Sequence, residues 1–281
     1  MLTKKRSGVL GDGRLPGLFI LLLMTVVFSS GCTDFIDATY RYEEPFSQTI
    51  AIKEPGSFSL SNINGSITIT SSPELTVVIK ATKYARWRKE DLERVRIEVV
   101  GGEKSVIVDT VYEKRNLQVK VDYELTVPEN MALEMVKTVN GRLNLTGKFE
   151  RAQLRTTNGS ITVRGDTGWL EAVTTNGSLD VINVKGRTSL KTTNGSIKLE
   201  LDEIVADLEA KTTNGSLTIR LKNQPNAYFS ARTTNGSVRL DFPVTVEGSL
   251  SRRRVEGRMG SGQGPRIELH TTNGSITMQK I

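Results

Sequence analysis

The pentapeptide Thr-Thr-Asn-Gly-Ser, present at residues 192–196, decides the fold because the chain repeats it along its second half. Apolar residues recur seven and five positions before the repeat glycine, and two and four positions after it. This alternation on both sides of Asn-Gly predicts two half-buried β-strands that meet at a sharp corner. Further identical copies occupy residues 156–160, 174–178, 212–216, 233–237 and 271–275, and altered copies occupy residues 62–66 and 138–142.

Two architectures place strands on both sides of such a corner. Asn-Gly between alternating strands is a strong hairpin signal, which would give a meander of antiparallel hairpins. In a parallel β-solenoid each repeat instead forms one coil, and like residues stack about 4.8 Å apart on the next coil. A hairpin turn needs only Asn-Gly, whereas stacking explains why the whole pentapeptide is repeated. We therefore predict an all-β fold, a parallel β-solenoid (β-helix) with coils of 18–21 residues, the interval between most repeat glycines.

The asparagines of the repeat are predicted to be structural. The first Thr and the Asn of each pentapeptide are expected to point inward. Each would hydrogen-bond to the same residue of the neighbouring coils, which satisfies buried polar groups. The predicted ladder contains Asn64, Asn140, Asn158, Asn176, Asn194, Asn214, Asn235 and Asn273, with Asn273 at its end.

From Gly65 to Gly141 the chain advances 76 residues, and this stretch carries separate strand patterns in place of the repeat. They predict an antiparallel β-meander that caps the first coil and covers its open edge. The coil at Gly141 has Glu134 where other coils have an apolar residue, so it is expected at an edge or a transition. The predicted divisions are a tether at 32–45, the meander and first coil at 46–130, the solenoid at 131–281, and within it a long loop at 243–266.

The N-terminus has the parts of a bacterial export signal. Basic residues precede an apolar run from Leu18 to Phe28, and small residues then lead to Cys32. The run is short for a membrane span, so residues 1–31 are predicted to be a signal peptide. A cysteine after a small residue at this point resembles the lipobox, which implies cleavage before Cys32 and its acylation. An uncleaved signal anchor and an ordinary signal peptide with an incidental cysteine are the alternatives.

Several features in order resemble the bacterial putative-adhesin family of domains of unknown function, which is related to the head-GIN β-helix domains. They are the early Asn-Gly-Ser at 64–66, the strand that closes on residues 123–128, the tandem pentapeptides, and the Gly-Pro insertion before the final repeat. The resemblance covers residues 46–281 and implies the solenoid fold. It supplies no catalytic or ligand residues, since a fold does not imply a function.

The net charge and the counts of cysteine and histidine exclude several classes of function. The chain carries +7, of which residues 1–31 contribute +3, and the remaining +4 does not indicate a nucleic-acid binder. With one cysteine and with His270 as the only histidine, no metal or cofactor is expected. Carboxylates are spread over outward strand positions instead of gathered in one groove. A β-helix polysaccharide lyase or hydrolase is therefore the least favoured class.

The predicted function is a non-enzymatic lipoprotein of the bacterial cell envelope, exported and held to the membrane by its lipid anchor. It would serve as an adhesin-like binding or spacing scaffold, and an envelope-stress accessory protein is the alternative. Basic residues four positions before the repeat glycine would align as an outward stripe, which we interpret first as solvated surface. The better candidates for contact with an acidic glycan or envelope component are Arg252, Arg253, Arg254 and Arg258.

Overall fold

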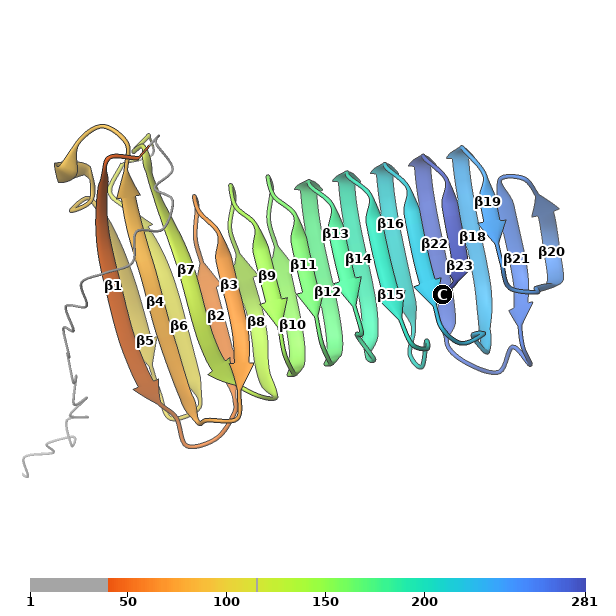
Figure 1. Ribbon diagram of the computed structural model, residues 1–281, viewed down its shortest axis with the longest axis horizontal. Helices are drawn as coiled ribbons and strands as arrows, with labels where there is room; N and C mark the ends of the chain where they lie inside the picture. The colour runs from red at the N-terminus through yellow and green to blue at the C-terminus, as the bar shows by residue number, and fades with distance from the viewer. Residues whose placement is uncertain (1–39, 115) are drawn as a thin grey trace, which may run out of the picture. The chain divides into compact units, whose positions relative to one another are not determined.

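The computed structural model describes residues 40–114 and 116–281, which form two long β-sheets that meet at the repeat corners (Figure 1). We call them sheet A and sheet B. Sheet A has 11 strands, in the order β1-β4-β7-β3-β9-β11-β13-β15-β17-β23-β19. Sheet B has 12 strands, in the order β20-β21-β18-β22-β16-β14-β12-β10-β8-β2-β6-β5.

Each coil contributes the strand before Asn-Gly to sheet B and the strand after it to sheet A. Like strands of neighbouring coils pair in parallel, so that Leu179 lies opposite Ile197, and Ile197 opposite Leu217. Asn-Gly therefore does not close hairpins, and the predicted all-β fold with large parallel sheets is confirmed. The coils are β2 (Ser57–Ser61) with β3 (Ile67–Ser72), β8 (Met131–Lys137) with β9 (Leu143–Thr146), β10 (Phe149–Arg155) with β11 (Ile161–Arg164), β12 (Thr167–Asn176) with β13 (Leu179–Ile182), β14 (Arg187–Asn194) with β15 (Ile197–Leu201), β16 (Leu208–Asn214) with β17 (Leu217–Leu221), β18 (Ala227–Asn235) with β19 (Val238–Leu240), and β22 (Arg266–Asn273) with β23 (Ile276–Lys280).

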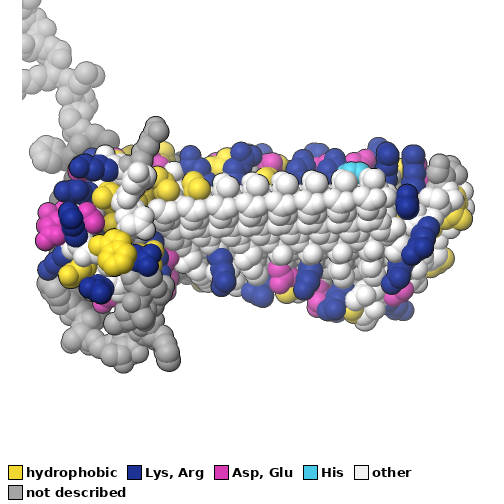
Figure 2. Space-filling model, turned by 90° about the horizontal axis from the view of Figure 1, so that it is seen from above, with side chains coloured by type: hydrophobic (Ala, Val, Ile, Leu, Met, Phe, Trp, Pro, Cys, Tyr) yellow, Lys and Arg dark blue, Asp and Glu magenta, His cyan; other side chains and the backbone are white. Residues whose placement is uncertain are grey.

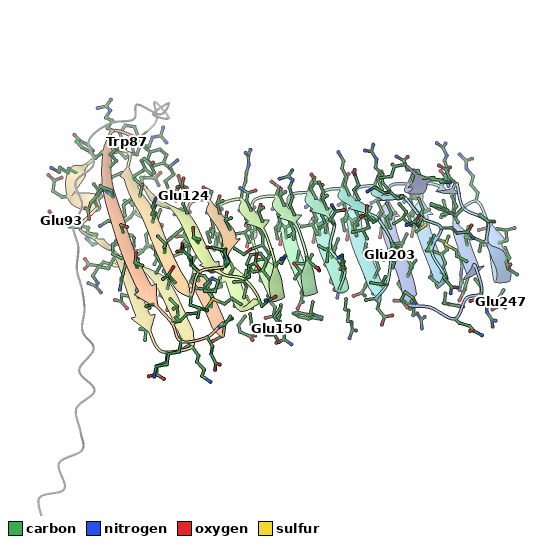
Figure 3. The ribbon with its side chains drawn as sticks, turned by 60° about the horizontal axis from the view of Figure 1, so that its bottom comes forward. Trp87, Glu93, Glu124, Glu150, Glu203 and Glu247 are labelled. Carbon is green, nitrogen blue, oxygen red and sulfur yellow. The ribbon has the colours of Figure 1, made fainter. Side chains whose placement is uncertain are left out.

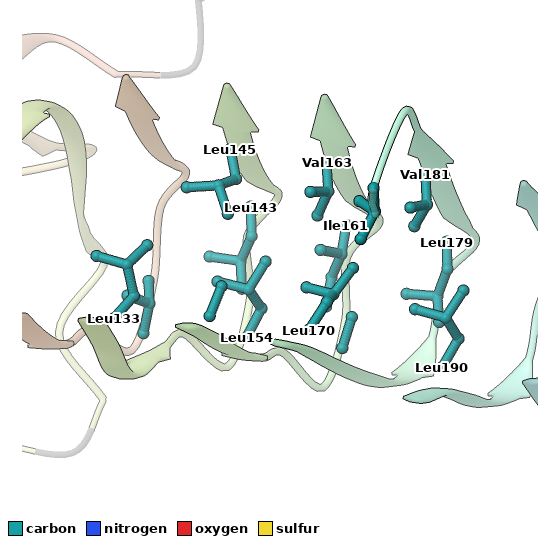
Figure 4. Close-up of a cluster of buried hydrophobic side chains, with 14 of the residues drawn as sticks. Leu133, Leu143, Leu145, Leu154, Ile161, Val163, Leu170, Leu179, Val181 and Leu190 are labelled. Atoms are coloured by element: carbon teal, nitrogen blue, oxygen red, sulfur yellow. The ribbon is translucent and has the colours of Figure 1, made fainter. Parts of the chain in front are cut away.

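The alternating apolar residues of the two sheets face each other and fill the interior (Figure 4). In the coil at Gly177 the four predicted inward residues, Leu170, Ala172, Leu179 and Val181, are fully buried. Burial of one Leu or Val side chain stabilises a fold by about 1.5–3 kcal/mol. Because every coil adds such a set to the next, the coils share one continuous core.

The coil at Gly141 lies inside the stack, between β2 and β10. Its strand β8 shifts register beside Glu134, and Phe58 lies opposite Leu133 before the shift. This bulge places Leu133 in the core and turns Glu134 outward, where it pairs with Arg151 at 3.2 Å. The prediction of an edge here was wrong, because one additional residue in the strand explains the broken pattern.

At the C-terminal end the coils do not stack in chain order. Strand β23 lies between β17 and β19, and β22 lies between β16 and β18. The last coil of the sequence therefore inserts between the two coils that precede it. The expectation that Asn273 ends the ladder was wrong, since the coil of Asn235 takes the outer place.

A β-hairpin returns the chain to this inserted position. Its strands are β20 (Thr245–Ser251) and β21 (Arg254–Met259), and β21 pairs with β18 in antiparallel orientation. The prediction of a long loop at 243–266 was wrong for these two strands. Val255 and Met259 are buried on one face of β21, so the segment extends sheet B beyond the last coil.

The non-repeat strands pair with the first coil at the other end of the molecule. Strands β6 and β7 run parallel to β2 and β3, and the strands outside them are antiparallel. Strand β1 begins at Tyr42, inside the segment predicted as a tether, and pairs with β4. These elements are β1 (Tyr42–Ala51), β4 (Thr76–Ala85), the 3-10 turn η1 (Lys89–Asp91), β5 (Val95–Gly101), β6 (Ser105–Tyr112) and β7 (Val119–Pro128).

Candidate functional site

The asparagines of the repeat form a continuous ladder of side-chain hydrogen bonds along the solenoid. Asn194 Nδ2 donates to Asn176 Oδ1 at 2.8 Å, and Asn214 Nδ2 donates to Asn194 Oδ1 at 2.7 Å. The same bond joins every neighbouring pair, with distances of 2.7–2.8 Å. The spatial order is Asn64, Asn140, Asn158, Asn176, Asn194, Asn214, Asn273 and Asn235.

This ladder lies on the outside of the corner, so the prediction of inward asparagines was wrong. Residues three and one positions before the glycine would share a face in a straight strand. The chain bends between them, and Thr192 is buried while Thr193 and Asn194 are exposed. The ladder therefore joins exposed amides instead of satisfying buried ones.

The first Thr of the repeat does point inward, but it does not bond to its own kind. Thr192 Oγ1 donates to the carbonyl oxygen of Gly177 in the neighbouring coil, at 2.9 Å. The equivalent bond, at 2.7–3.2 Å, is made by Thr138, Thr156, Thr174, Thr212, Thr233 and Thr271. Each hydroxyl thus donates a hydrogen bond to a carbonyl of the adjacent corner. Both the buried donor and the buried acceptor therefore have a partner.

The outside of the corner is an uncharged surface that runs along the coils. We call it the Thr-Asn face, and it consists of the second Thr, the Asn and the Ser of each pentapeptide. Figure 2 shows a continuous uncharged band along the coils, with Lys and Arg as well as Asp and Glu on both sides of it. Among the eight repeats only Arg142 puts a charge at the Ser position. The face offers hydrogen-bonding groups at a regular spacing of about 4.8 Å.

The outer face of sheet B carries charges of both signs. Four positions before the repeat glycine, the sheet register aligns one row of mostly basic residues. This row reads Val173, Lys191, Lys211, His270, Arg232 and then Arg254 of the hairpin. A hollow of about 260 Å³ lies among Lys211, Arg232, His270 and Arg254.

Carboxylates lie beside this basic row, two residues away along the strands. Glu209 forms ion pairs with Lys211 and with Lys191, the latter at 3.1 Å, and it accepts a hydrogen bond from Ser189 at 3.0 Å. Partial burial alone would raise the pKa of Glu209, but these hydrogen bonds outweigh it and lower the pKa to about 2. Glu209 borders an open groove of about 450 Å³ and stays ionised there, so it is unsuited to donate a proton.

The four predicted arginines do not form one patch. Arg252 and Arg253 occupy the hairpin turn, where their carbonyls accept hydrogen bonds from Val238 N–H and Thr233 N–H, both at 2.9 Å. Arg254 begins β21 and pairs with Glu256 at 2.8 Å. Arg258 lies further along β21 and pairs with Glu247 at 2.9 Å. The turn therefore places three of the four at the C-terminal end of the Thr-Asn face.

The predicted lipidation site, Cys32, lies outside the described residues. Among residues 40–114 and 116–281, no cluster of His, Cys, Asp and Glu suited to a metal ion is found. In the same ranges no helix has the length and hydrophobicity that a membrane span requires.

The family model Toastrack DUF4097 matches residues 130–279, which is more than half of the chain. The chain belongs to the Toastrack DUF4097 family. The Toastrack match begins next to β8 and includes the pentapeptide coils, the hairpin and the inserted coil. The match confirms the sequence resemblance to a family of domains of unknown function.

Three solved structures are similar to this Toastrack protein. A putative cell adhesion protein from Clostridium sporogenes is 13% identical, with a TM-score of 0.35, over 85% of this chain and 100% of that chain. A putative adhesin from Bacteroides fragilis is 14% identical, with a TM-score of 0.35, over 85% and 97%. A putative lipid binding protein from Parabacteroides distasonis is 13% identical, with a TM-score of 0.29, over 84% and 96%. The comparison with curated proteins finds no match.

Two features of the Toastrack solenoid escaped the sequence analysis. The Thr-Asn face was missed because Asn was assigned to the interior, although the exposed second Thr of each copy is itself a signal of an outward row. The alignment of Arg254 with the basic row was missed because it depends on pairing between β18 and β21. No local pattern encodes that pairing, since 22 residues separate Arg232 from Arg254.

Proposed function

We propose that this protein is a non-enzymatic, adhesin-like scaffold of the bacterial envelope that binds through the outside of its solenoid. The observation that carries the proposal is that the inward and outward side chains of each repeat have different roles. Inward side chains of every coil pack against one another and fill the interior, while outward side chains form continuous rows. Such a structure repeats one small set of contact groups many times along a line.

The Thr-Asn face is the principal contact surface in this proposal. Each of the six identical repeats presents the hydroxyl and methyl group of its second Thr beside an Asn amide, whose ladder bonds leave it further hydrogen-bonding capacity. One coil alone would bind weakly because exposed polar groups are well hydrated. Contacts repeated along the face add by multivalency, which strengthens binding without any strong single site.

Envelope attachment is proposed to occur through Cys32. Acylation of its sulfur and of the new amino terminus supplies more than one acyl chain, which stable anchoring requires. In this scheme the non-repeat strands cap the first coil, and the solenoid extends from the anchored end. Lipidation, the cap and the adhesin-like role belong together in this proposal.

The contact surface is tested by substitution on the Thr-Asn face. Thr175→Glu with Thr193→Glu adds two charges to the face at exposed positions, and Thr162→Glu with Thr218→Glu adds two charges to the outer face of sheet A. We expect the first pair to reduce retention of the purified protein on envelope preparations at least severalfold, and the second pair to leave it unchanged. Equal retention of both variants and of the wild type would refute the Thr-Asn face as the contact surface.

Attachment is tested separately. Wild-type cells fed a fatty-acid analogue should label the protein, and Cys32→Ala should abolish both the label and lipoprotein-type processing. Protease treatment of intact cells should remove the solenoid if it is displayed on the surface. Undiminished labelling of the Cys32→Ala variant would rule out this residue as the anchor.

A further inference from the structure

Aromatic side chains gather where the described part of the chain begins. Tyr40 packs edge-on against Tyr84, with ring centroids 6.2 Å apart, and Lys120 Nζ lies 4.8 Å from the centroid of each ring. Tyr42 is 38% exposed and Trp87 is 57% exposed. We call Tyr40, Tyr42, Tyr84 and Trp87 the aromatic cluster because they lie at the same end of the N-terminal strands, with Tyr42 and Tyr84 on opposite faces of sheet A. It contains half of the 2 Trp and 6 Tyr residues of the chain.

Strand pairing brings these residues to one end of the N-terminal strands. Tyr42 at the start of β1 lies opposite Ala85 at the end of β4, and Arg41 N–H donates to the Ala85 carbonyl at 3.1 Å. Trp87 follows in the turn after β4 and lies at the end of these strands (Figure 3). The chain therefore enters the fold beside Trp87.

One basic residue contacts the exposed indole, and others follow it in the sequence. The Arg86 guanidinium lies over the Trp87 ring, 4.7 Å from its centroid, and Arg88 and Lys89 come directly after Trp87, before the acidic Glu90 and Asp91 of η1. Within the described part of the chain, Arg86, Arg88 and Lys89 form no ion pair. Trp and Tyr favour the interface between bilayer and water, and Lys and Arg are attracted to anionic headgroups. The cluster and its basic neighbours thus have the composition of an interfacial contact.

The chain length upstream places this cluster close to any anchor on Cys32. Tyr40 is the eighth residue after Cys32. A chain of that length spans at most about 29 Å even when fully extended. A membrane that holds an acylated Cys32 would therefore lie within reach of Trp87.

We propose that the aromatic cluster contacts the headgroup layer of the membrane that holds the Cys32 anchor. This inference rests on the proposed anchoring of the protein. The indole of Trp87 enters the interface, and Arg86, Arg88 and Lys89 face the lipid phosphates. The tether alone would leave the solenoid free to rotate, whereas this second contact fixes the tilt of the coil axis relative to the membrane. The Thr-Asn face is then held at a defined angle to the bilayer.

The test uses the two tryptophans as reporters on the full-length chain. Cys32 is the only cysteine, so its thiol can be coupled to a maleimide-bearing phospholipid in vesicles of phosphatidylcholine and phosphatidylglycerol, whether or not cells acylate it. Trp169→Phe leaves Trp87 as the only tryptophan, and the matched variant Trp87→Phe leaves Trp169. Emission is recorded with brominated lipids in the bilayer and with acrylamide in the buffer.

In the Trp169→Phe protein we expect a shift of Trp87 emission to shorter wavelength and about twofold quenching by brominated lipid, as for an indole at the interface. The Trp87→Phe control should show neither change. Trp87 emission that remains sensitive to acrylamide and insensitive to brominated lipid, in protein that floats with the vesicles, would overturn the inference. It would also fail if the shift appears without vesicles as protein concentration rises, because the cluster would then join two copies of the chain. If Cys32 is found not to be acylated in cells, that result contradicts the anchoring proposal and leaves the vesicle result for the aromatic cluster unaffected.

Discussion

Stacked backbones explain why the pentapeptide contains glycine. A Cβ built on Gly177 would lie 1.9 Å from the carbonyl oxygen of Gly159 in the next coil, and the repeat glycines on either side are equally close to their neighbours. At Gly177 glycine is required by this close approach and not by a turn conformation, since its φ is not in the left-handed region. The Thr and Asn beside it then supply the hydrogen bonds that hold successive corners together.

Substitution of the repeat glycine should therefore be severe. Gly177→Ala forces two backbones apart, and we expect a loss of about 3 kcal/mol, at the upper end for overpacking. The control is Gly102→Ala, where the nearest atom to the added Cβ is Ser105 Oγ at 3.3 Å in an exposed turn. It should change stability by no more than about 0.5 kcal/mol. Urea unfolding of both variants measures the difference, and similar midpoints would contradict the stacked corner.

The asparagine ladder should contribute according to the number of bonds that each member makes. Asn194 joins two neighbours, whereas Asn235 joins only Asn273 among the described residues. A hydrogen bond contributes about 0.5–1.5 kcal/mol net, and exposed ones lie at the low end because water replaces them. We expect Asn194→Ala to lower the free energy of unfolding about twice as much as Asn235→Ala. Denaturant titration decides this, and equal effects would mean that the ladder does not act as a connected unit.

Among the elements, the inserted coil differs most from what the repeat alone predicts. Strand β18 is held on one side by β22 in parallel and on the other by β21 in antiparallel orientation. The hairpin thereby covers the outer edge of β18, which would otherwise expose a row of unpaired backbone groups. The chain therefore passes the position beside β16, forms β18 and the hairpin, and then returns to place β22 between β16 and β18.

Engineered disulfides test this order of coils. Neighbouring strands lie about 4.8 Å apart, within the Cα separation of about 4.4–6.8 Å that a disulfide allows, and next-nearest strands lie about twice as far. In a Cys32→Ala background, Asn214→Cys with Asn273→Cys should form a disulfide on oxidation. Asn214→Cys with Asn235→Cys should not. Gel mobility without reductant measures disulfide formation. A disulfide in the second pair and none in the first would indicate that the coils stack in chain order.

Across the whole molecule, charge is arranged along the solenoid and at its C-terminal end. The Thr-Asn face is neutral except at Arg142, the outer face of sheet B carries both signs, and Arg252, Arg253 and Arg254 lie in and beside the hairpin turn next to β18. Contacts between exposed charges are screened beyond about 8 Å at physiological salt. A polyanion that meets the arginine turn would therefore bind in a salt-dependent way, unlike a neutral ligand on the Thr-Asn face.

Replacement of the three arginines separates these two kinds of binding. Arg252→Ser, Arg253→Ser and Arg254→Ser together should weaken binding to an acidic glycan at least severalfold at low salt, with no change in the β circular dichroism signal. Lys198→Ser, Arg220→Ser and Lys222→Ser remove the same charge from the outer face of sheet A and should have little effect. If binding survives the arginine substitutions or is independent of salt, the turn serves only to close the last coil.

The sequence by itself determined the strands of the coils, their inward apolar residues and their stacking. Alternation around each Asn-Gly is a local property, and identical side chains such as Asn176 and Asn194 can bond only if their coils are in register. The tertiary structure decided which way the corner turns its asparagines, where the last coil inserts and which distant residues meet. Pairing of β22 with both β16 and β18 follows from edge strands that any copy of the repeat could cover. The pairing of the hairpin with β18 selects the arrangement in which β22 lies between β16 and β18. Likewise, only the pairing of β1 with β4 brings Tyr42 beside the turn of Trp87. Such contacts depend on which strand edges remain open once the local strands have formed.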